Sequence, residues 1–237
     1  METASTETLR HVTEAIESRR SVRAFLDEDV PKEVLEDMLR VAARAPSGNN
    51  TQPWKVYALK GDAKTQLSEA VMQAHEESIA HPAKLDDWDY PYYPERFVEP
   101  YLSRRRANGW SLYQLLGIER GDKEKMHAQM GRNYLFFDAP VGLIFTTHKS
   151  MAMGAWIDMG AYMQNVMTMA RAYDLHTCPQ AAFVAFHRVV RETLSISEDE
   201  IVICGMSLGY EDTSALVNQL RTEREPLENF ADFRGEW

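Results

Sequence analysis

Three arginines and a serine stand close together near the start of the chain. The segment Arg19-Arg20-Ser21-Val22-Arg23 follows a helical pattern. A guanidinium group is a planar fork that can bind a phosphate group through two hydrogen bonds. In an extended segment alternate side chains face the same way, so Arg19, Ser21 and Arg23 can reach one ligand while Val22 packs inward. The segment predicts a small-anion site, with a solvated basic surface as the alternative.

Two further polar stretches could complete such a site. Residues 45–54 read Ala-Pro-Ser-Gly-Asn-Asn-Thr-Gln-Pro-Trp, and their amides and hydroxyls can hydrogen-bond to the edge of a planar polar ring. Near the C-terminus, residues 218–224 read Asn-Gln-Leu-Arg-Thr-Glu-Arg. From its residue types alone, this second basic run reads as a charged surface helix.

Hydrophobic periodicity predicts the elements that position these stretches. Helices are expected over residues 6–18, 31–45, 62–79, 101–116, 123–133, 154–173 and 187–194. Extended segments are expected over residues 54–60, 141–147, 177–183 and 200–209. The segment 82–100 is rich in proline and aromatic residues and should be irregular. The elements do not alternate strictly, which predicts an α+β domain with helices on both faces of a sheet.

Two parts of the chain should need a partner surface. The helix over 154–173 is apolar almost all round, so it must be covered on every side and is expected at a subunit interface. The tail from Tyr210 is long and polar, and such a segment is ordered only if it docks on something.

Composition excludes several classes of protein. The 237 residues, 44% of them hydrophobic, suffice for one large domain or two small ones. The net charge of −10 argues against nucleic acid and anionic membranes as partners. We expect no membrane span, because the longest apolar run contains charged and amide residues. Two cysteines and a polar N-terminus without a signal pattern indicate a reducing, cytoplasmic setting.

Several common catalytic motifs are missing from the sequence. There is no GxGxxG after a strand and no phosphate-binding GxxxxGK[ST], and no nucleophile elbow is predicted. No HExxH or CxxC is present, and the seven histidines are scattered, so no metal site is expected. Each histidine is interpreted as structural or solvent-facing.

The two N-terminal stretches, in this order, resemble the RRSxR and APSxxNxQPW motifs of the nitroreductase family of flavoproteins, which bind flavin mononucleotide (FMN). The resemblance continues to the tail. It implies a central, mostly antiparallel sheet flanked by helices, in a domain-entwined homodimer with a flavin at each end of the interface. It also implies one domain over residues 1–237. Residues 82–118 would be a substrate-covering insertion, and residues 210–237 a tail that docks on the dimer and on the FMN phosphate.

The resemblance assigns cofactor-binding residues from both ends of the chain. Arg19, Ser21, Arg221 and Arg224 would hold the phosphate. Arg23 would lie by the N1–C2 carbonyl edge of the flavin, where a cation favours the reduced, anionic ring. The other implied cofactor-binding residues are Arg20, Pro46, Ser47, Gly48, Asn50, Gln52, Asn133, Pro179, Gln180, Ala181 and Ala182.

Some of these residues have more specific expected roles. Asn50 would reach the flavin from the partner subunit, and Gln52 would mainly stabilise its own loop. A backbone N–H at Ala181 or Ala182 would bond flavin N5, although many relatives carry an acidic residue and glycine there. Cys178 is interpreted as a buried structural thiol, with a redox thiol as the alternative.

The implied activity is the reduction of nitroaromatic or similar electron-poor compounds by NADH or NADPH through ping-pong hydride transfer. No side chain is expected to act as a catalytic acid or base. The arginines at 104–106 would attract a carboxylated acceptor or the NADPH 2′-phosphate, or else form a solvated helix face. Other functions remain open: reductive dehalogenation or ene reduction on the same scaffold, or flavin binding without catalysis.

Overall fold

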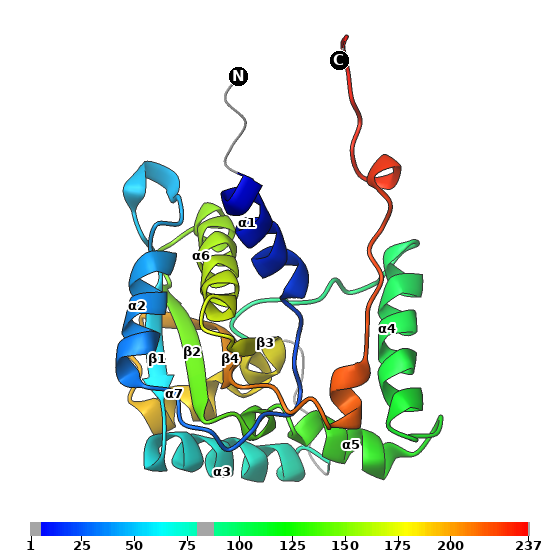
Figure 1. Ribbon diagram of the computed structural model, residues 1–237. Coiled ribbons are helices and arrows are strands. Elements are labelled where there is room, and N and C mark those ends of the chain that lie inside the picture. Colours follow the sequence, from blue (N-terminus) through cyan, green and yellow to red (C-terminus); the bar gives the residue numbers. More distant parts are fainter. Residues whose placement is uncertain (1–5, 80–87, 237) are drawn as a thin grey trace.

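The computed structural model describes residues 6–79 and 88–236 (Figure 1). The helices in these ranges are α1 (Thr6–Ser18), α2 (Lys32–Ala42), α3 (Asp62–Glu77), α4 (Tyr101–Leu115), α5 (Lys123–Gly131), α6 (Gly154–Arg171) and α7 (His187–Leu194). The strands are β1 (Lys55–Leu59), β2 (Val141–His148), β3 (His176–Gln180) and β4 (Glu200–Gly209). Short 3-10 helices lie at Gly48–Asn50, Phe136–Asp138, Ala181–Phe186, Leu216–Gln219 and Leu227–Asn229.

The strands form one antiparallel sheet in the order β1-β2-β4-β3. Strand β2 pairs with the central strand β4 over the whole length of β2, with Phe145 opposite Cys204 and a shift of register directly after Phe145. Both strands are almost completely buried. A strand that is covered on both faces of the sheet needs apolar side chains on both faces. The sequences of these two strands are therefore nearly continuous runs of apolar residues. The expected α+β fold with a mostly antiparallel sheet is confirmed.

Helices cover both faces of this sheet. On one face α2 and α6 build a core that includes the buried residues Met38, Met159, Val166, Leu143 and Phe145. On the other face a second core includes Leu67 of α3, Val190 of α7, Ile144, Val202 and Phe183. The two cores hold the sheet rigidly, so the loops and helix ends at its edges have fixed positions.

Two helices leave apolar side chains in solvent on the single chain. Ile157 of α6 is 78% exposed, although the buried face of α6 packs on the sheet. The apolar face of α1, with Leu9, Val12 and Ile16, is also exposed, and α1 lies beside α6 (Figure 1). This surface agrees with the expectation that α6 needs a further partner to cover it.

The prediction for one extended segment was wrong. Residues 177–183 were expected to be extended throughout, but β3 ends at Gln180 and a 3-10 helix begins at Ala181. The cause is the packing of Phe183 on β4. A Cβ atom at Gly205 would lie 2.4 Å from Phe183 Cδ2. Because glycine has no side chain, the Phe183 ring can pack directly on the backbone of β4 at this position. The chain must turn to bring Phe183 onto this spot.

Other differences are at element ends. The helix expected to reach Ile79 ends at Glu77, and the helix expected to reach Asn133 ends at Gly131. Of the irregular segment expected over 82–100, residues 88–100 contain no helix or strand, and 82–87 lie outside the described residues. Among the described helices, none is both long and apolar enough to cross a membrane.

Candidate functional site

The basic segment after α1 is extended and lies against β3. The Val22 N–H donates to the Thr177 carbonyl at 3.1 Å, and Ser21 forms a parallel bridge with Thr177. Val22 is completely buried. The expected alternation is therefore present: Val22 points into the core, while Arg19, Ser21 and Arg23 line a common cavity.

The start of the C-terminal tail is fastened to the same segment. Asn218, which is 4% exposed, accepts a hydrogen bond from the Arg23 N–H at 2.8 Å. Its side-chain amide also donates to the Ala24 and Asp212 carbonyls, both at 2.8 Å. Backbone hydrogen bonds from Leu26 to Tyr210 and from Asp212 to Ala24 continue this pairing. The tail thus docks on the N-terminal segment although nearly 200 positions separate them.

A cavity of about 1050 Å³ opens between the two ends of the chain. Six arginines line it: Arg19, Arg20, Arg23, Arg171, Arg221 and Arg224. Two carboxylates, Glu17 and Glu211, are also present. In the part of the chain that the structure describes, Arg20 is the only one of these arginines with a carboxylate at ion-pair distance. The cavity therefore carries a local excess of positive charge in a protein whose net charge is −10.

Arg19 and Arg224 come close enough to influence each other. Burial and the nearby Arg224 guanidinium lower the pKa of Arg19 below its ordinary value. Arg221 and Arg224 donate only to neighbouring carbonyl groups and to the Thr222 hydroxyl among the described residues. Two cations held together in this way repel each other, so an anion between them would be strongly favoured.

Arg20 has a different environment from the other arginines. Its guanidinium pairs with Glu211, whose side chain is 6% exposed, and donates to the Asn218 carbonyl at 3.4 Å. These contacts make Arg20 an anchor that holds the start of the tail on the basic segment. Its expected contact with a cofactor remains a prediction, although the residue does line the cavity.

The sequence did not assign Arg171, His176 or Glu211 to the cavity that they line. Arg171 ends α6 and donates to Ser18 Oγ at 3.0 Å and to the Leu175 carbonyl at 2.7 Å. His176 lies 3.2 Å from Arg171 and 3.5 Å from Glu211. Burial, with the Arg171 charge, lowers the pKa of His176 to about 4. Arg171 was visible only as the charged end of an apolar helix, and no local motif marks the other two.

The polar loop 45–54 is away from this cavity in the single chain. Figure 1 shows the loop before β1 and the C-terminal tail on opposite sides of α6. The Gly48 N–H donates to Asp158 of α6 at 3.1 Å, and Asn50 is exposed. Gln52 donates to the Asn50 carbonyl at 3.2 Å and its N–H to Ser47 Oγ at 3.0 Å. These two contacts agree with the loop-stabilising role expected for Gln52.

Pro46, Ser47 and Gly48 belong to the same loop. Asn49, Asn50 and Gln52 have φ values of 51°, 59° and 47°, a left-handed conformation that asparagine tolerates better than most residues. The loop is therefore held in one shape by its own hydrogen bonds and by α6. It presents its amide groups outward, where a second copy of the chain could place them at a ligand.

The segment around the end of β3 is also built by side-chain amides. Gln180 donates to the Asn133 carbonyl at 2.6 Å and accepts from Ser207 Oγ at 2.8 Å. Asn133 donates to the Met130 carbonyl at 2.9 Å. Both Gln180 and Asn133 thus have structural partners, and they fix the turn at which Ala181 and Ala182 follow Pro179 on β3.

The helix α4 reaches the tail from the other side. Arg104 pairs with Glu225 at 2.9 Å, and Arg105 lies over the rings of Tyr93 and Phe97. Asn108 of α4 lines the cavity. Arg104 and Arg105 therefore have partners within the chain, and the expected covering segment contributes to the cavity wall through Asn108.

Both cysteines are buried and not joined in a disulfide. Burial raises the pKa of Cys178, although Arg23 and Ser21 act in the opposite direction. Burial also raises the pKa of Cys204 to about 12. A thiol with a raised pKa stays protonated and is a poor nucleophile, which favours the structural interpretation of Cys178.

Comparisons with known proteins agree with this geometry. The model of the Nitroreductase family matches residues 16–210. A 4-nitrobenzoate reductase of Nocardioides sp. (strain LMS-CY) is 40% identical over 92% of this chain and 87% of its own length. A chloronitrobenzene nitroreductase of Comamonas testosteroni is 38% identical over 94% and 96%. The crystal structure of the FMN-dependent nitroreductase NfnB from Mycobacterium smegmatis in complex with NADPH superposes with a TM-score of 0.90 at 31% identity, covering 96% and 100% of the two chains.

Proposed function

This chain belongs to the nitroreductase family, and from that premise we propose that it is an FMN-dependent oxidoreductase that uses NADH or NADPH to reduce nitroaromatic compounds. The observation that carries the proposal is the basic cavity between the two chain ends. The FMN phosphate is a dianion near neutral pH, and it needs donors that are themselves charged. Arg19 and Arg224, close together and without a carboxylate partner among the described residues, fit such a group.

Different residues around the cavity would bind different parts of FMN. Arg19, Ser21, Arg221 and Arg224 would bind the phosphate, because they line the same cavity from two segments. Arg23 would lie nearer the ring, where its charge stabilises the reduced, anionic form. When bound, FMN supplies the hydride chemistry, and the chain provides position and charge.

Other residues would meet the flavin ring itself. Ala181 or Ala182 would offer a backbone N–H at the turn after β3, which Gln180 and Asn133 hold in place. Asn50, with Pro46, Ser47 and Gly48, would approach from the partner subunit, since this loop faces outward on its own chain. The electron donor and the acceptor would bind in turn in one slot, so the absence of a separate nicotinamide motif is expected.

We further propose a homodimer in the cytoplasm. The exposed apolar faces of α1 and α6 support a second copy as the partner, and so does the end of the tail, where Leu227, Phe230 and Phe233 are exposed. In Figure 1 this part of the tail extends away from the body of the chain. Such a segment would wrap around a partner subunit. Two buried cysteines without a disulfide support a reducing compartment.

The test of the function uses the purified protein. It should be yellow, and FMN should be released when it is denatured. Mixing with NADH or NADPH without oxygen should bleach the flavin absorbance, and 4-nitrobenzoate or nitrobenzene should restore it. Colourless protein that takes up no added FMN would contradict the proposal. A bound flavin that NADPH leaves oxidised would favour binding without catalysis, and a reduced flavin that only halogenated or ene acceptors reoxidise would favour the alternative chemistries.

A further inference from the structure

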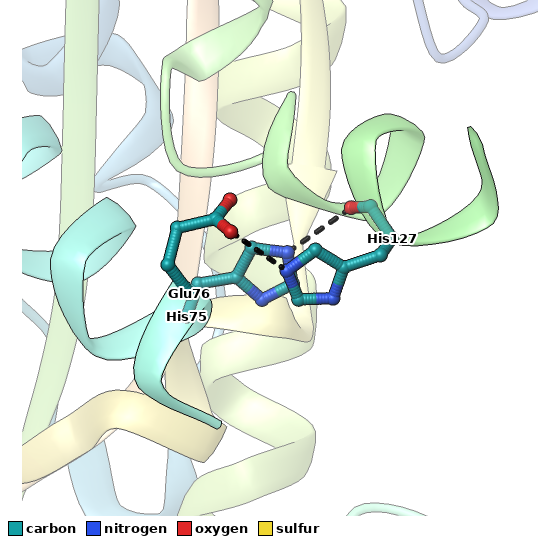
Figure 2. A group of neighbouring side chains, drawn as sticks. All are labelled: His75, Glu76 and His127. Atoms are coloured by element: carbon teal, nitrogen blue, oxygen red, sulfur yellow. Dashed lines mark hydrogen bonds and ion pairs between the residues drawn. The ribbon is translucent and has the colours of Figure 1, made fainter. Parts of the chain in front are cut away.

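Two histidines that were expected to be isolated meet where α3 and α5 pack together. The rings of His75 and His127 stack with centroids 3.7 Å apart and planes 5° from parallel. Glu76 Oε2 lies 3.5 Å from His127 Nε2. Figure 2 shows the carboxylate of Glu76 facing the His127 ring, and His75 beside it. The fold thus gathers two of the seven histidines and a carboxylate, which their separation in the sequence concealed.

The packing of α5 against α3 creates this arrangement. Gly131 ends α5, and a Cβ atom there would lie 3.2 Å from Met72 Cε and 3.3 Å from His75 Cδ2. A larger residue would therefore crowd the Met72 and His75 side chains. His75 is 5% exposed, with the Tyr134 ring at 5.0 Å on its inner side. The inner wall of the group is closed, whereas the side chain of Glu76 is 57% exposed and leaves a route from solvent.

The three side chains form a donor set that is specific for certain cations. One ligand atom from each of His75, Glu76 and His127 lies within 4.8 Å of the others. Two imidazoles and one carboxylate suit Zn²⁺ and similar transition metals, which accept three protein ligands and a water molecule. Mg²⁺ and Ca²⁺ prefer oxygen ligands throughout. The donor set therefore selects the zinc class over these more abundant ions.

The hydrogen bonds around the group match those of a metal site. His75 Nε2 donates to the His127 carbonyl at 3.0 Å, because a carbonyl oxygen can only accept. The other ring nitrogen of His75, Nδ1, therefore keeps its lone pair. A ligating histidine usually donates its second ring N–H to such an acceptor. His127 Nε2 is buried and has no hydrogen-bond partner among the described residues, because 3.5 Å to Glu76 exceeds a good hydrogen bond. A cation would satisfy both this nitrogen and the carboxylate.

We propose that His75, Glu76 and His127 form a binding site for a zinc-type divalent metal ion that ties α5 to α3. The lone pairs of an imidazole lie in the plane of its ring, so two stacked rings cannot both point at one ion. Binding therefore turns His127, which is the more exposed ring, out of the stack.

The experiment uses the untagged holoprotein after treatment with a chelator. Titration with Zn²⁺ in a calorimeter should show one ion bound per chain, and Co²⁺ should produce the visible absorption of a nitrogen–oxygen site. Mg²⁺ should give no signal. The variants His127→Asn and Glu76→Gln should each weaken Zn²⁺ binding about 100-fold, since even outer partners of a ligand contribute 10- to 100-fold. His148→Asn removes an exposed histidine elsewhere and should bind Zn²⁺ like the wild type.

A thermal measurement separates a bound ion from a general effect on folding. Saturating Zn²⁺ should raise the Tm of the wild type and of His148→Asn, but not that of His127→Asn, because an ion stabilises only the state that binds it. Glu76 is largely exposed, so Glu76→Gln tests the site even if His127→Asn folds poorly. Absence of Zn²⁺ binding by the wild type would overturn the proposal. Equal Zn²⁺ affinities of the wild type and of both site variants would also overturn the proposal.

Discussion

The contact between Arg20 and Glu211 decides how the other arginines are presented. Glu211 is buried and neutralises Arg20, while Asn218 joins the Arg23 backbone to the tail. Arg19 and Arg224 are left without a carboxylate partner in the described part of the chain. One arginine of the basic segment therefore organises the site, and its neighbours remain free to bind an anion.

The variant Glu211→Gln tests this anchoring role. It keeps the size of the side chain but leaves the half-buried Arg20 charge without its counter-ion. We expect the free energy of unfolding of the FMN-free protein to fall by about 2–3 kcal/mol, as measured by urea denaturation. FMN affinity should also fall, because the tail start loses its position. Glu228→Gln, at an exposed tail position, is the control. A variant as stable as this control would mean that the ion pair contributes little.

At the scale of elements, the junction of α6 with β3 forms one wall of the cavity. Arg171 ends α6 and His176 begins β3, and the two side chains meet beside Glu211 and Arg20. His176 must stay neutral to fit among these charges. The same junction carries the tail anchor, so its protonation state is linked to the stability of the site.

The depressed pKa of His176 predicts a specific dependence on pH. Its folded-state pKa is about 4, below the unfolded value of about 6.5. Between these values the unfolded chain binds the extra proton, so stability is lost as the pH falls from about 6.5 to 4. The loss from this group is at most about 3 kcal/mol. The variant His176→Asn should show a shallower decline in this window, measured by denaturation of the FMN-free protein. Parallel curves for variant and wild type would contradict the assignment.

On the scale of the whole molecule, α1 and α6 leave apolar faces exposed on the single chain. Ile157 stands in solvent at 78% exposure on a helix whose other side is buried in the core. The loop 45–54 also turns its amides outward. In the proposed homodimer, a second copy would cover the apolar surface and bring its loop to the cavity, so association and flavin binding would depend on each other.

Replacement of Ile157 by aspartate should disrupt this association. The wild type should sediment with twice the 27.2 kDa mass of one chain. We expect Ile157→Asp to shift it toward the single chain and to lower its FMN content, because an unpaired charge in an apolar interface is costly. Ile79→Asp places the same change on a comparably exposed isoleucine at the end of α3. A dimer that tolerates Ile157→Asp as well as Ile79→Asp would locate the interface elsewhere.

Much of this architecture could be predicted from local sequence. The periodicity located most helices and strands. The alternation of Arg19, Ser21 and Arg23 predicted that they face one ligand, and the motif resemblance implied that Arg221 and Arg224 join them; all five line one cavity. What escaped prediction depends on contacts between distant segments. The turn at Ala181 follows from Phe183 packing over Gly205. The pairing of Arg20 with Glu211, and of His75 with His127, exists only after the chain has folded.

The central claim is that arginines from both ends of the chain hold one phosphate dianion. The most direct measurement is the FMN dissociation constant of Arg19→Ala, Arg224→Ala and the double variant, with Arg40→Ala on the exposed face of α2 as a control. Each single change should weaken FMN binding about 10- to 100-fold, as expected for a lost charge-assisted hydrogen bond. The double variant should lose the cofactor on dialysis while its fold survives. Retention of FMN with wild-type affinity by the double variant would contradict the account.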